Sequence, residues 1–276
     1  MPELPEVETI ARTLAGDLEG AVFHDVAVRH ECALEQPTEE FVEKLRGRAI
    51  IKVGRRGKLL LLLLEGDYFF VCHLRMTGRL YVPQPDDAPD AHTHLVFTLT
   101  GADGRTFPLH YRDVRKFGSC RVQTPAELAR WPFYARLGPE PLEMSAADFA
   151  KRLQDKQGRI KAVLLDQSVI AGLGNIYVDE ALFRAGIRPD TPASSISAQR
   201  MERLQTAVQE VLREAIAGCG SSIRDYVDGR GNAGSFQNCF RVYGRAGQPC
   251  LACGSPLVKT TVAGRTTVFC PHCQKK

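Results

Sequence analysis

The sequence of 276 residues lacks any hydrophobic run long enough to cross a membrane. Its longest purely apolar run, Leu59–Leu64, has six leucines, whereas a spanning helix needs about 20 apolar residues. The first residues, MPELPEVETI, are acidic and no apolar segment follows them, so nothing predicts an export signal. We therefore expect a cytoplasmic protein with no membrane partner, in which the leucine run is a buried strand.

Acidic residues are absent from two stretches. Residues 46–58 (RGRAIIKVGRRGK) contain six basic residues and no acid, and residues 229–276 contain seven basic residues and no acid. Residues 1–45, in contrast, carry eleven acids and three bases, and the net charge is only +4. Because a solvated face normally mixes charges of both signs, this pattern favours a polyanionic partner, with nucleic acid preferred over a basic surface that binds nothing.

No internal repeat is visible, and helical and β signals occupy separate regions. Apolar residues recur at helical spacing from Leu4 to Leu18, and short β-rich runs punctuated by Gly, Asp and Pro follow from about residue 22 to 122. A Pro-rich joint then leads into a helical region whose start, Ser145 to Asp148, matches a capping box. The fold class expected is α+β, with an antiparallel β-sandwich that a helix precedes, a helical domain and a Cys-rich module. The expected boundaries are 1–136, 137–238 and 239–276.

The nine cysteines do not predict a disulfide framework, because no export signal accompanies them. Five are scattered and are interpreted as small buried apolar residues: Cys32, Cys72, Cys120, Cys219 and Cys239. The other four, Cys250, Cys253, Cys270 and Cys273, form a C-x2-C-x16-C-x2-C pattern. Each C-x2-C pair places two thiolates on one tight turn, and two such turns complete a tetrahedral set of soft ligands. This predicts one structural zinc ion with no open position for catalysis, with iron or a chance pattern as the alternatives. Strand-like runs between the two C-x2-C pairs predict a β-hairpin with Arg265 at its turn. Arg265 is interpreted either as a contact to a phosphate or to the substrate, or as a solvated turn residue.

Two helical segments flank the sequence AGLGN. Gly172 and Gly174 break the helix, and Asn175 can cap the next one. Amide groups at such a turn form an anion site. Three basic residues lie close upstream: Lys156, Arg159 and Lys161.

Two loops, HLRMTG and YRDVRKFG, each place an apolar side chain among cations. Met76 and Phe117 can serve as wedges that open a base stack, or they can pack at strand ends.

The first residues after Met1 combine proline with carboxylates. Removal of Met1 would leave Pro2 with a secondary amine, whose attack on a sugar C1′ gives a cationic iminium and makes strand elimination feasible. Glu3 could then transfer the proton. In the alternative interpretation, Pro2 and Pro5 only shape the first helical turn, and the helix dipole favours the carboxylates of Glu3, Glu6 and Glu8 there.

Taken together, these motifs resemble the formamidopyrimidine-DNA glycosylase family of bacterial repair enzymes. The resemblance spans the whole chain and rests on PELPEVET, GRRGK, HLRMTG, RDVRKFG, LGPEPL, GLGNIYVDE, VYGRAGQPC and GRTTVFCPHCQ. The related endonuclease VIII type typically begins PEGPE, whereas this chain has Leu4 at the position of that glycine.

The resemblance implies roles residue by residue. Pro2 would be the nucleophile that forms the Schiff base, Glu3 the proton donor, Lys58 the residue that acts in β-elimination and Arg265 the one that acts in δ-elimination. DNA-backbone contacts would come from His92, Arg115, Lys156 and Asn175. Met76, Arg115 and Phe117 would fill the gap that the flipped nucleotide leaves. The loop Ser221–Phe236 would be a lid over the extruded base.

The expected function is therefore a bifunctional glycosylase and abasic-site lyase that excises oxidised purines from duplex DNA. The expected protein is a nucleoid-associated monomer that needs no small-molecule cofactor. Two alternatives remain: an endonuclease VIII-like glycosylase for oxidised pyrimidines, and a non-catalytic zinc protein that binds DNA.

Overall fold

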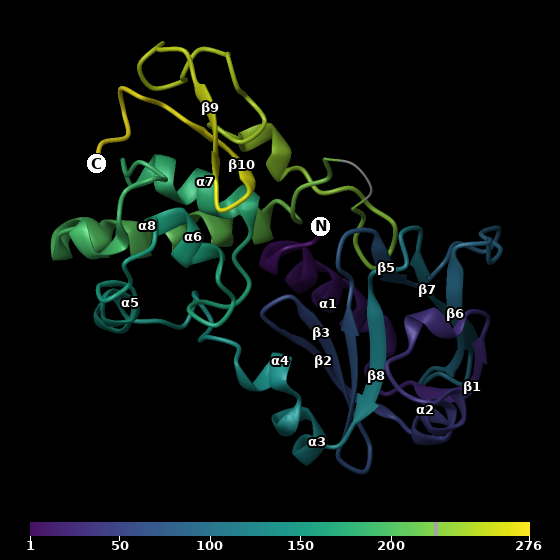
Figure 1. Cartoon of the computed structure of the whole chain (residues 1–276). Helices are drawn as coiled ribbons and strands as arrows, with labels where there is room; N and C mark the ends of the chain where they lie inside the picture. Colours follow the sequence, from purple (N-terminus) through teal and green to yellow (C-terminus); the bar gives the residue numbers. More distant parts are fainter. Residues whose placement is uncertain (224–225) are drawn as a thin grey trace. The chain divides into compact units, whose positions relative to one another are not determined.

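The computed structural model describes residues 1–223 and 226–276, and its contacts divide the chain into two compact units. The first unit contains Met1–Ala135 and Gly218–Ser235, so a segment from late in the sequence returns to the N-terminal region. The second unit contains Arg136–Ala217 and Phe236–Lys276. Figure 1 follows this path by colour from purple at the N-terminus to yellow at the C-terminus.

The first unit is built on two four-stranded antiparallel sheets, which confirms the predicted sandwich (Figure 1). One sheet has the order β1-β6-β7-β5 and the other the order β2-β3-β4-β8. The strands are β1 (Val22–Val28), β2 (Ile50–Arg56), β3 (Leu59–Leu64), β4 (Tyr68–His73), β5 (Gly78–Tyr81), β6 (Thr93–Thr100), β7 (Thr106–Asp113) and β8 (Ser119–Gln123).

The leucine run forms β3, which pairs with β2 on one side and β4 on the other. Leu60, Leu62 and Leu64 are fully buried, as predicted for this run. Rings from both sheets meet in the core beside them, where Phe97 of β6 contacts Phe70 of β4 at a centroid distance of 5.6 Å. The leucine strand is therefore part of a closely packed apolar core between the two sheets.

Helix α1 (Leu4–Leu18) begins almost at the first residue and packs against β2 and β3. Its buried positions include Val7, Ile10 and Leu14, which share one face at a spacing of three and four residues. Glu3 is the N-cap residue, and its backbone N–H donates to the Glu6 carboxylate at 2.9 Å. The terminal residues are thus ordered as part of the fold.

The remaining helices are short, except for one in the second unit. In the first unit these are η1 (Glu31–Ala33), α2 (Thr38–Leu45), α3 (Pro125–Arg130) and α4 (Pro132–Ala135). The second unit contains α5 (Ala146–Leu153), α6 (Ile160–Leu165), α7 (Asn175–Arg184), η2 (Ala193–Ser195), α8 (Ala198–Ala217), η3 (Phe236–Cys239) and the hairpin strands β9 (Val258–Val262) and β10 (Arg265–Phe269). The predicted cap of α5 is confirmed, because Ser145 Oγ accepts from the Asp148 N–H at 3.1 Å.

Two local predictions are wrong. The N-cap of α7 is Gly174, and Asn175 makes no capping bond because its amide donates instead to the Thr266 carbonyl at 3.0 Å. Of the five scattered cysteines, only Cys72 and Cys120 are buried, whereas the others lie on exposed connecting segments or short turns: Cys32, Cys219 and Cys239.

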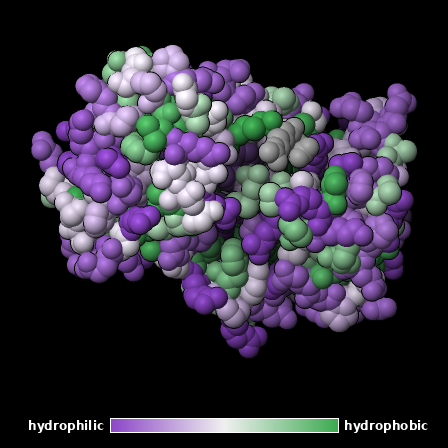
Figure 2. Space-filling view, turned by 45° about the horizontal axis from the view of Figure 1, so that its top comes forward, coloured by the Kyte–Doolittle hydropathy of each residue, from purple (hydrophilic) through white to green (hydrophobic). Residues whose placement is uncertain are grey.

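Within residues 1–223 and 226–276, no helix has the length and apolar character needed to cross a membrane. The face in Figure 2 is mostly hydrophilic, with small and separate hydrophobic patches.

Candidate functional site

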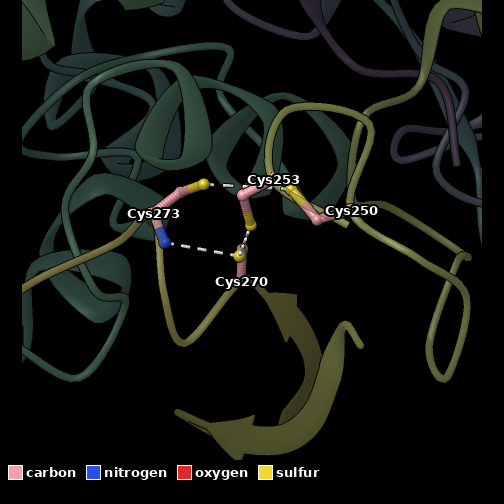
Figure 3. Close-up of side chains that lie close together, drawn as sticks. All are labelled: Cys250, Cys253, Cys270 and Cys273. Carbon is pink, nitrogen blue, oxygen red and sulfur yellow. Dashed lines mark hydrogen bonds between the residues drawn. The ribbon is translucent and has the colours of Figure 1, made fainter. Parts of the chain in front are cut away.

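The metal centre lies at the base of the C-terminal hairpin. Cys250 and Cys253 precede β9, Cys270 and Cys273 follow β10, and the four side chains point toward one another (Figure 3). All four sulphur atoms lie within 4.8 Å of one another, with pairs at 3.5 and 3.9 Å. Four thiolates around zinc at about 2.3 Å require sulphur separations of about 3.8 Å, so the cluster fits the ion. The predicted structural zinc site is confirmed.

The hairpin turn consists of Ala263 and Gly264, and both have positive φ angles, of 51° and 69°. Two such residues form the turn type that suits a two-residue β-hairpin. Arg265 is the first residue of β10, pairs with Val262 and is exposed. Its guanidinium is therefore carried by a short, well-defined turn.

A buried ion pair joins helices α6 and α7 to this hairpin. Lys161 Nζ lies 2.7 Å from Asp179 Oδ1, and both side chains are almost completely buried. Lys161 also donates to the Thr266 carbonyl at 3.2 Å, and Asp179 accepts from the Val268 N–H at 3.3 Å. Burial, the largest influence, raises the pKa of Asp179 to about 6, while Lys161 acts in the opposite direction. Lys161 is thus a structural residue, a role that its position close upstream of the AGLGN turn did not predict.

Glu180, next along α7, anchors the segment that leads to the zinc knuckles. Its carboxylate accepts from the backbone N–H groups of Arg241, Val242 and Tyr243 at 2.8 to 3.0 Å. Burial raises its pKa, and these three hydrogen bonds favour the charged form. Figure 1 shows α7 beside the hairpin that these contacts support. Sequence reasoning missed this role because the three donors are more than 60 residues away.

The N-terminal candidates lie in buried surroundings. Pro2 is buried, Glu3 is 3% exposed and Lys58 is 8% exposed. Lys58 follows Gly57, which has a φ angle of 57°, in the turn between β2 and β3, the two strands that pack against α1. The sequence motifs predicted these three residues as candidates but did not indicate that all three are buried.

His73 is a further member of this region that sequence reasoning missed. It lies at the end of β4 opposite Leu59, the residue after Lys58. Burial, with smaller contributions from Arg75 and Lys58, lowers its pKa to about 3. Its Nδ1 accepts from the Arg75 N–H at 3.1 Å, so the neutral ring orients the HLRMTG loop.

The structure brings the two wedge loops together around Asp113. This buried carboxylate accepts from the Thr77 hydroxyl in one loop and from the N–H groups of Arg115 and Gly118 in the other. Asp113 was not predicted, because its role depends on the pairing of β5 with β7.

The tips of these loops form a cluster of exposed side chains. Arg115 Nη1 lies 3.0 Å from Met76 Sδ, and its guanidinium is 4.6 Å from the centroid of the Phe117 ring. Met76 is 41% exposed and Phe117 is 55% exposed. Two apolar side chains and a cation therefore project together, as a wedge requires.

Other predicted contacts lie apart from these groups. His92 is half-buried, and its N–H donates to Asp90 at 2.9 Å. Lys156 is exposed before α6. The predicted lid, Ser221–Phe236, includes residues 224 and 225, which lie outside the described residues.

Comparison with known proteins covers the whole chain. Family models match three regions: the formamidopyrimidine-DNA glycosylase N-terminal domain over residues 1–120, its H2TH domain over residues 137–227, and a zinc finger found in FPG and IleRS over residues 247–276. The formamidopyrimidine-DNA glycosylase of Heliobacterium modesticaldum is 48% identical over 281 residues, with both chains covered completely.

Two solved structures are similar throughout. The complex of Lactococcus lactis Fpg with DNA containing an abasic site has a TM-score of 0.90 at 34% identity and covers 99% of this chain and 100% of that one. MutM in complex with DNA containing carbocyclic 8-oxo-G has a TM-score of 0.90 at 35% identity and covers both chains completely. The chain therefore belongs to the formamidopyrimidine-DNA glycosylase family.

Proposed function

We propose that this chain is a base excision repair enzyme, a DNA glycosylase and abasic-site lyase that removes oxidised purines from duplex DNA. The observation that carries the proposal is the full-length similarity, at 48% identity, to a protein named formamidopyrimidine-DNA glycosylase. Relatives of similar fold bind DNA containing an abasic site and DNA containing 8-oxo-G, so damaged duplex DNA is the proposed partner. The bacterial relatives support action in the cytoplasm, and we extend this to the nucleoid.

The first chemical step is assigned to the N-terminus. Once Met1 is removed, the secondary amine of Pro2 attacks C1′ of the damaged nucleotide. The glycosidic bond between C1′ and the base breaks, and the base leaves with the electron pair of that bond. Glu3 then moves the proton of the attacking amine to the ring oxygen O4′, the C1′–O4′ bond breaks, and the bond between C1′ and the Pro2 nitrogen becomes an iminium. The burial of Pro2 and Glu3 supports this assignment, because a water-poor site protects the iminium from hydrolysis.

The lyase steps follow from the iminium. It acidifies the C2′ proton, so loss of that proton expels the 3′ phosphate in β-elimination, to which Lys58 is assigned. A second elimination releases the 5′ phosphate, to which Arg265 is assigned. Backbone contacts are assigned to His92, Arg115, Lys156 and Asn175, although the Asn175 side chain also holds the hairpin through Thr266.

The wedge and the zinc hairpin have supporting roles. Met76, Arg115 and Phe117 are proposed to fill the gap that forms when the damaged nucleotide leaves the stack, which costs a few kcal/mol per unstacked step. Zinc, held by four cysteines, stabilises the hairpin that carries Arg265 and takes no part in bond breaking. We propose that residues 221–236 cover the extruded base.

Borohydride trapping tests the proposal. Borohydride reduces an iminium to a stable amine, so a duplex containing 8-oxoguanine should become linked to the protein, and peptide mapping should locate the link at Pro2. Pro2→Gly, which keeps a primary amine, should weaken trapping, whereas Pro5→Ala is the matched control at the other proline of the helix start. A link on a lysine would overturn the mechanism, and excision of oxidised pyrimidines alone would overturn the substrate assignment.

A further inference from the structure

The segment that returns to the first unit lies along helix α1, at its described residues 218–223 and 226–235. We call these residues the return segment. Contacts link it to both ends of the helix that begins beside Pro2. The inference drawn from these contacts rests on the proposed role of the Pro2 amine.

Glu6 makes the contact at the start of the helix. One carboxylate oxygen accepts from the Glu3 N–H at 2.9 Å, and the other accepts from the Ser221 N–H at 2.8 Å. The side chain is 1% exposed, so both bonds lie away from water. A single buried carboxylate therefore ties the peptide group next to Pro2 to Ser221, which lies 215 positions beyond Glu6 in the chain.

Tyr226 adds a second contact at the same end. Its hydroxyl donates toward the Glu6 carbonyl at 3.4 Å and the Cys219 carbonyl at 3.1 Å. The ring packs against the apolar core of the first unit, and burial, the largest influence, raises the pKa of the phenol. The hydroxyl therefore stays protonated and serves as a donor.

The other end of the helix is held by Arg230 and Gly229. Arg230 makes two parallel hydrogen bonds of 3.0 Å to the Asp17 carboxylate. The Gly229 N–H donates to the Thr13 hydroxyl at 3.0 Å, and its carbonyl accepts from the Val82 N–H at 3.0 Å. A Cβ at position 229 would lie 2.6 Å from the Leu14 side chain, so the backbone approaches α1 at a distance that only glycine permits.

The turn that presents these groups is internally ordered. Asp228 Oδ1 accepts from the N–H groups of Arg230 and Asn232 at 2.9 and 2.8 Å, and the Asp228 N–H donates to the Asn232 carbonyl. Glu6, Thr13 and Asp17 lie seven and four residues apart and so share one side of α1. The contacts form a row along the helix, and they do not depend on residues 224 and 225.

We infer that the return segment positions the N-terminal amine for attack, with Glu6 and the Arg230–Asp17 pair as positioning residues. Attack requires the nucleophile within about 3–3.5 Å of its target, so small displacements of α1 cost rate. Glu6 fixes the backbone beside Pro2, and Arg230 prevents the far end of the return segment from pulling away from the helix.

The decisive variant is Glu6→Gln. Both oxygens accept hydrogen bonds from backbone N–H groups. An amide NH2 in place of either oxygen would therefore face another donor, and one buried N–H group would lose its acceptor. The experiment measures the single-turnover rate of borohydride trapping on a duplex with a preformed abasic site. The variant should trap about tenfold more slowly, which equals about 1.4 kcal/mol, while the Kd for a duplex with a tetrahydrofuran abasic analogue stays within about twofold.

Charge exchange tests the far contact. Asp17→Arg and Arg230→Asp should each slow trapping about threefold, because the exposed pair is modest in energy, and the double variant should recover most of the rate. The matched control is the exchange of Asp25 and Arg46, an exposed pair at 2.9 Å that joins β1 to the residue after α2 and includes no residue of α1 or the return segment, which should leave the rate unchanged. Thermal unfolding of each variant corrects the rate for folded protein.

The outcomes separate this inference from the proposed function. If the wild-type protein gives no adduct at Pro2, the proposed mechanism fails. If the wild type traps at Pro2 and Glu6→Gln traps at the same rate per folded molecule, the positioning role fails alone. A charge-exchanged double variant no faster than its single variants would remove Arg230 and Asp17 from that role.

Discussion

The two units stabilise their candidate residues by different means. In the first unit, Pro2, Glu3 and Lys58 are buried at the start of α1 and in the β2–β3 turn, and these elements contribute to a large apolar core formed by two sheets and α1. In the second, the hairpin that carries Arg265 has a small core cluster of five residues: Val242, Cys250, Leu257, Val268 and Cys270. This small core is supplemented by three further contributions to the stability of the hairpin: the zinc thiolates, the Lys161–Asp179 ion pair and the hydrogen bonds of Glu180. The first region should therefore tolerate loss of metal, and the second should not.

Metal loss should produce the largest difference between the units. Structural zinc contributes about 10–16 kcal/mol of apparent binding free energy in small zinc modules, so Cys253→Ser should leave the hairpin disordered and weaken DNA binding by more than about tenfold. Hydrogen exchange should accelerate in β9 and β10 and stay slow in β3. Cys239→Ser, an exposed cysteine outside the cluster, is the control. Unchanged protection of β9 and β10 without metal would show that the core and ion pair suffice.

Breaking the buried ion pair should have the next largest effect. Lys161→Met leaves the Asp179 carboxylate buried without its cation, which should destabilise the second unit by about 3–5 kcal/mol in chemical denaturation. The double variant with Asp179→Leu should regain most of that stability, since neither charge then remains. Lys259→Met, at an exposed position on β9, is the matched control. A double variant less stable than Lys161→Met alone would mean that Asp179 acts mainly through the Val268 N–H.

Acidification should act on the first unit through His73, with a smaller effect. Its folded pKa of about 3 lies below the unfolded value of 6.5, so the unfolded state binds more protons between these values. The contribution of His73 to stability is therefore complete above pH 6.5 and falls by up to about 1.4 kcal/mol per pH unit as the pH drops toward 3. The difference in unfolding free energy between the wild type and His73→Asn should shrink from pH 7 to pH 5. Parallel curves of unfolding free energy against pH for the wild type and His73→Asn would contradict the assignment.

Local chemistry was predictable from the sequence where the partners are close in the chain. The zinc cysteines, the Ser145 cap and the leucine strand depend on spacings of a few residues, and the structure confirms them. The candidate residues Pro2, Glu3 and Lys58 came from motifs, and their catalytic roles stay predictions.

Tertiary partners were not predictable. The sequence shows Lys161 only as a basic residue close to two others, whereas in the fold it is buried and donates to Asp179 and to the Thr266 carbonyl. Asn175 was expected to cap its own helix, but Gly174 occupies that position and the amide reaches a strand 91 residues away. Glu6 looked like an ordinary acid in a first helical turn, and its bond to Ser221 spans 215 residues. Side-chain spacing carries no information about such distant donors.

Asp113 has an evolutionary consequence. One carboxylate accepts from the Thr77 hydroxyl in one loop and from the Gly118 N–H in the other, so a substitution that removes the Asp113 carboxylate releases both loops at once. Gly118 has little freedom, since a Cβ there would lie 2.2 Å from the Tyr111 hydroxyl and 2.8 Å from the His73 carbonyl. The exposed tips, Met76 and Phe117, are not bound by these constraints. Natural or laboratory selection can therefore vary the shape of the tips while the scaffold beneath them is inherited unchanged.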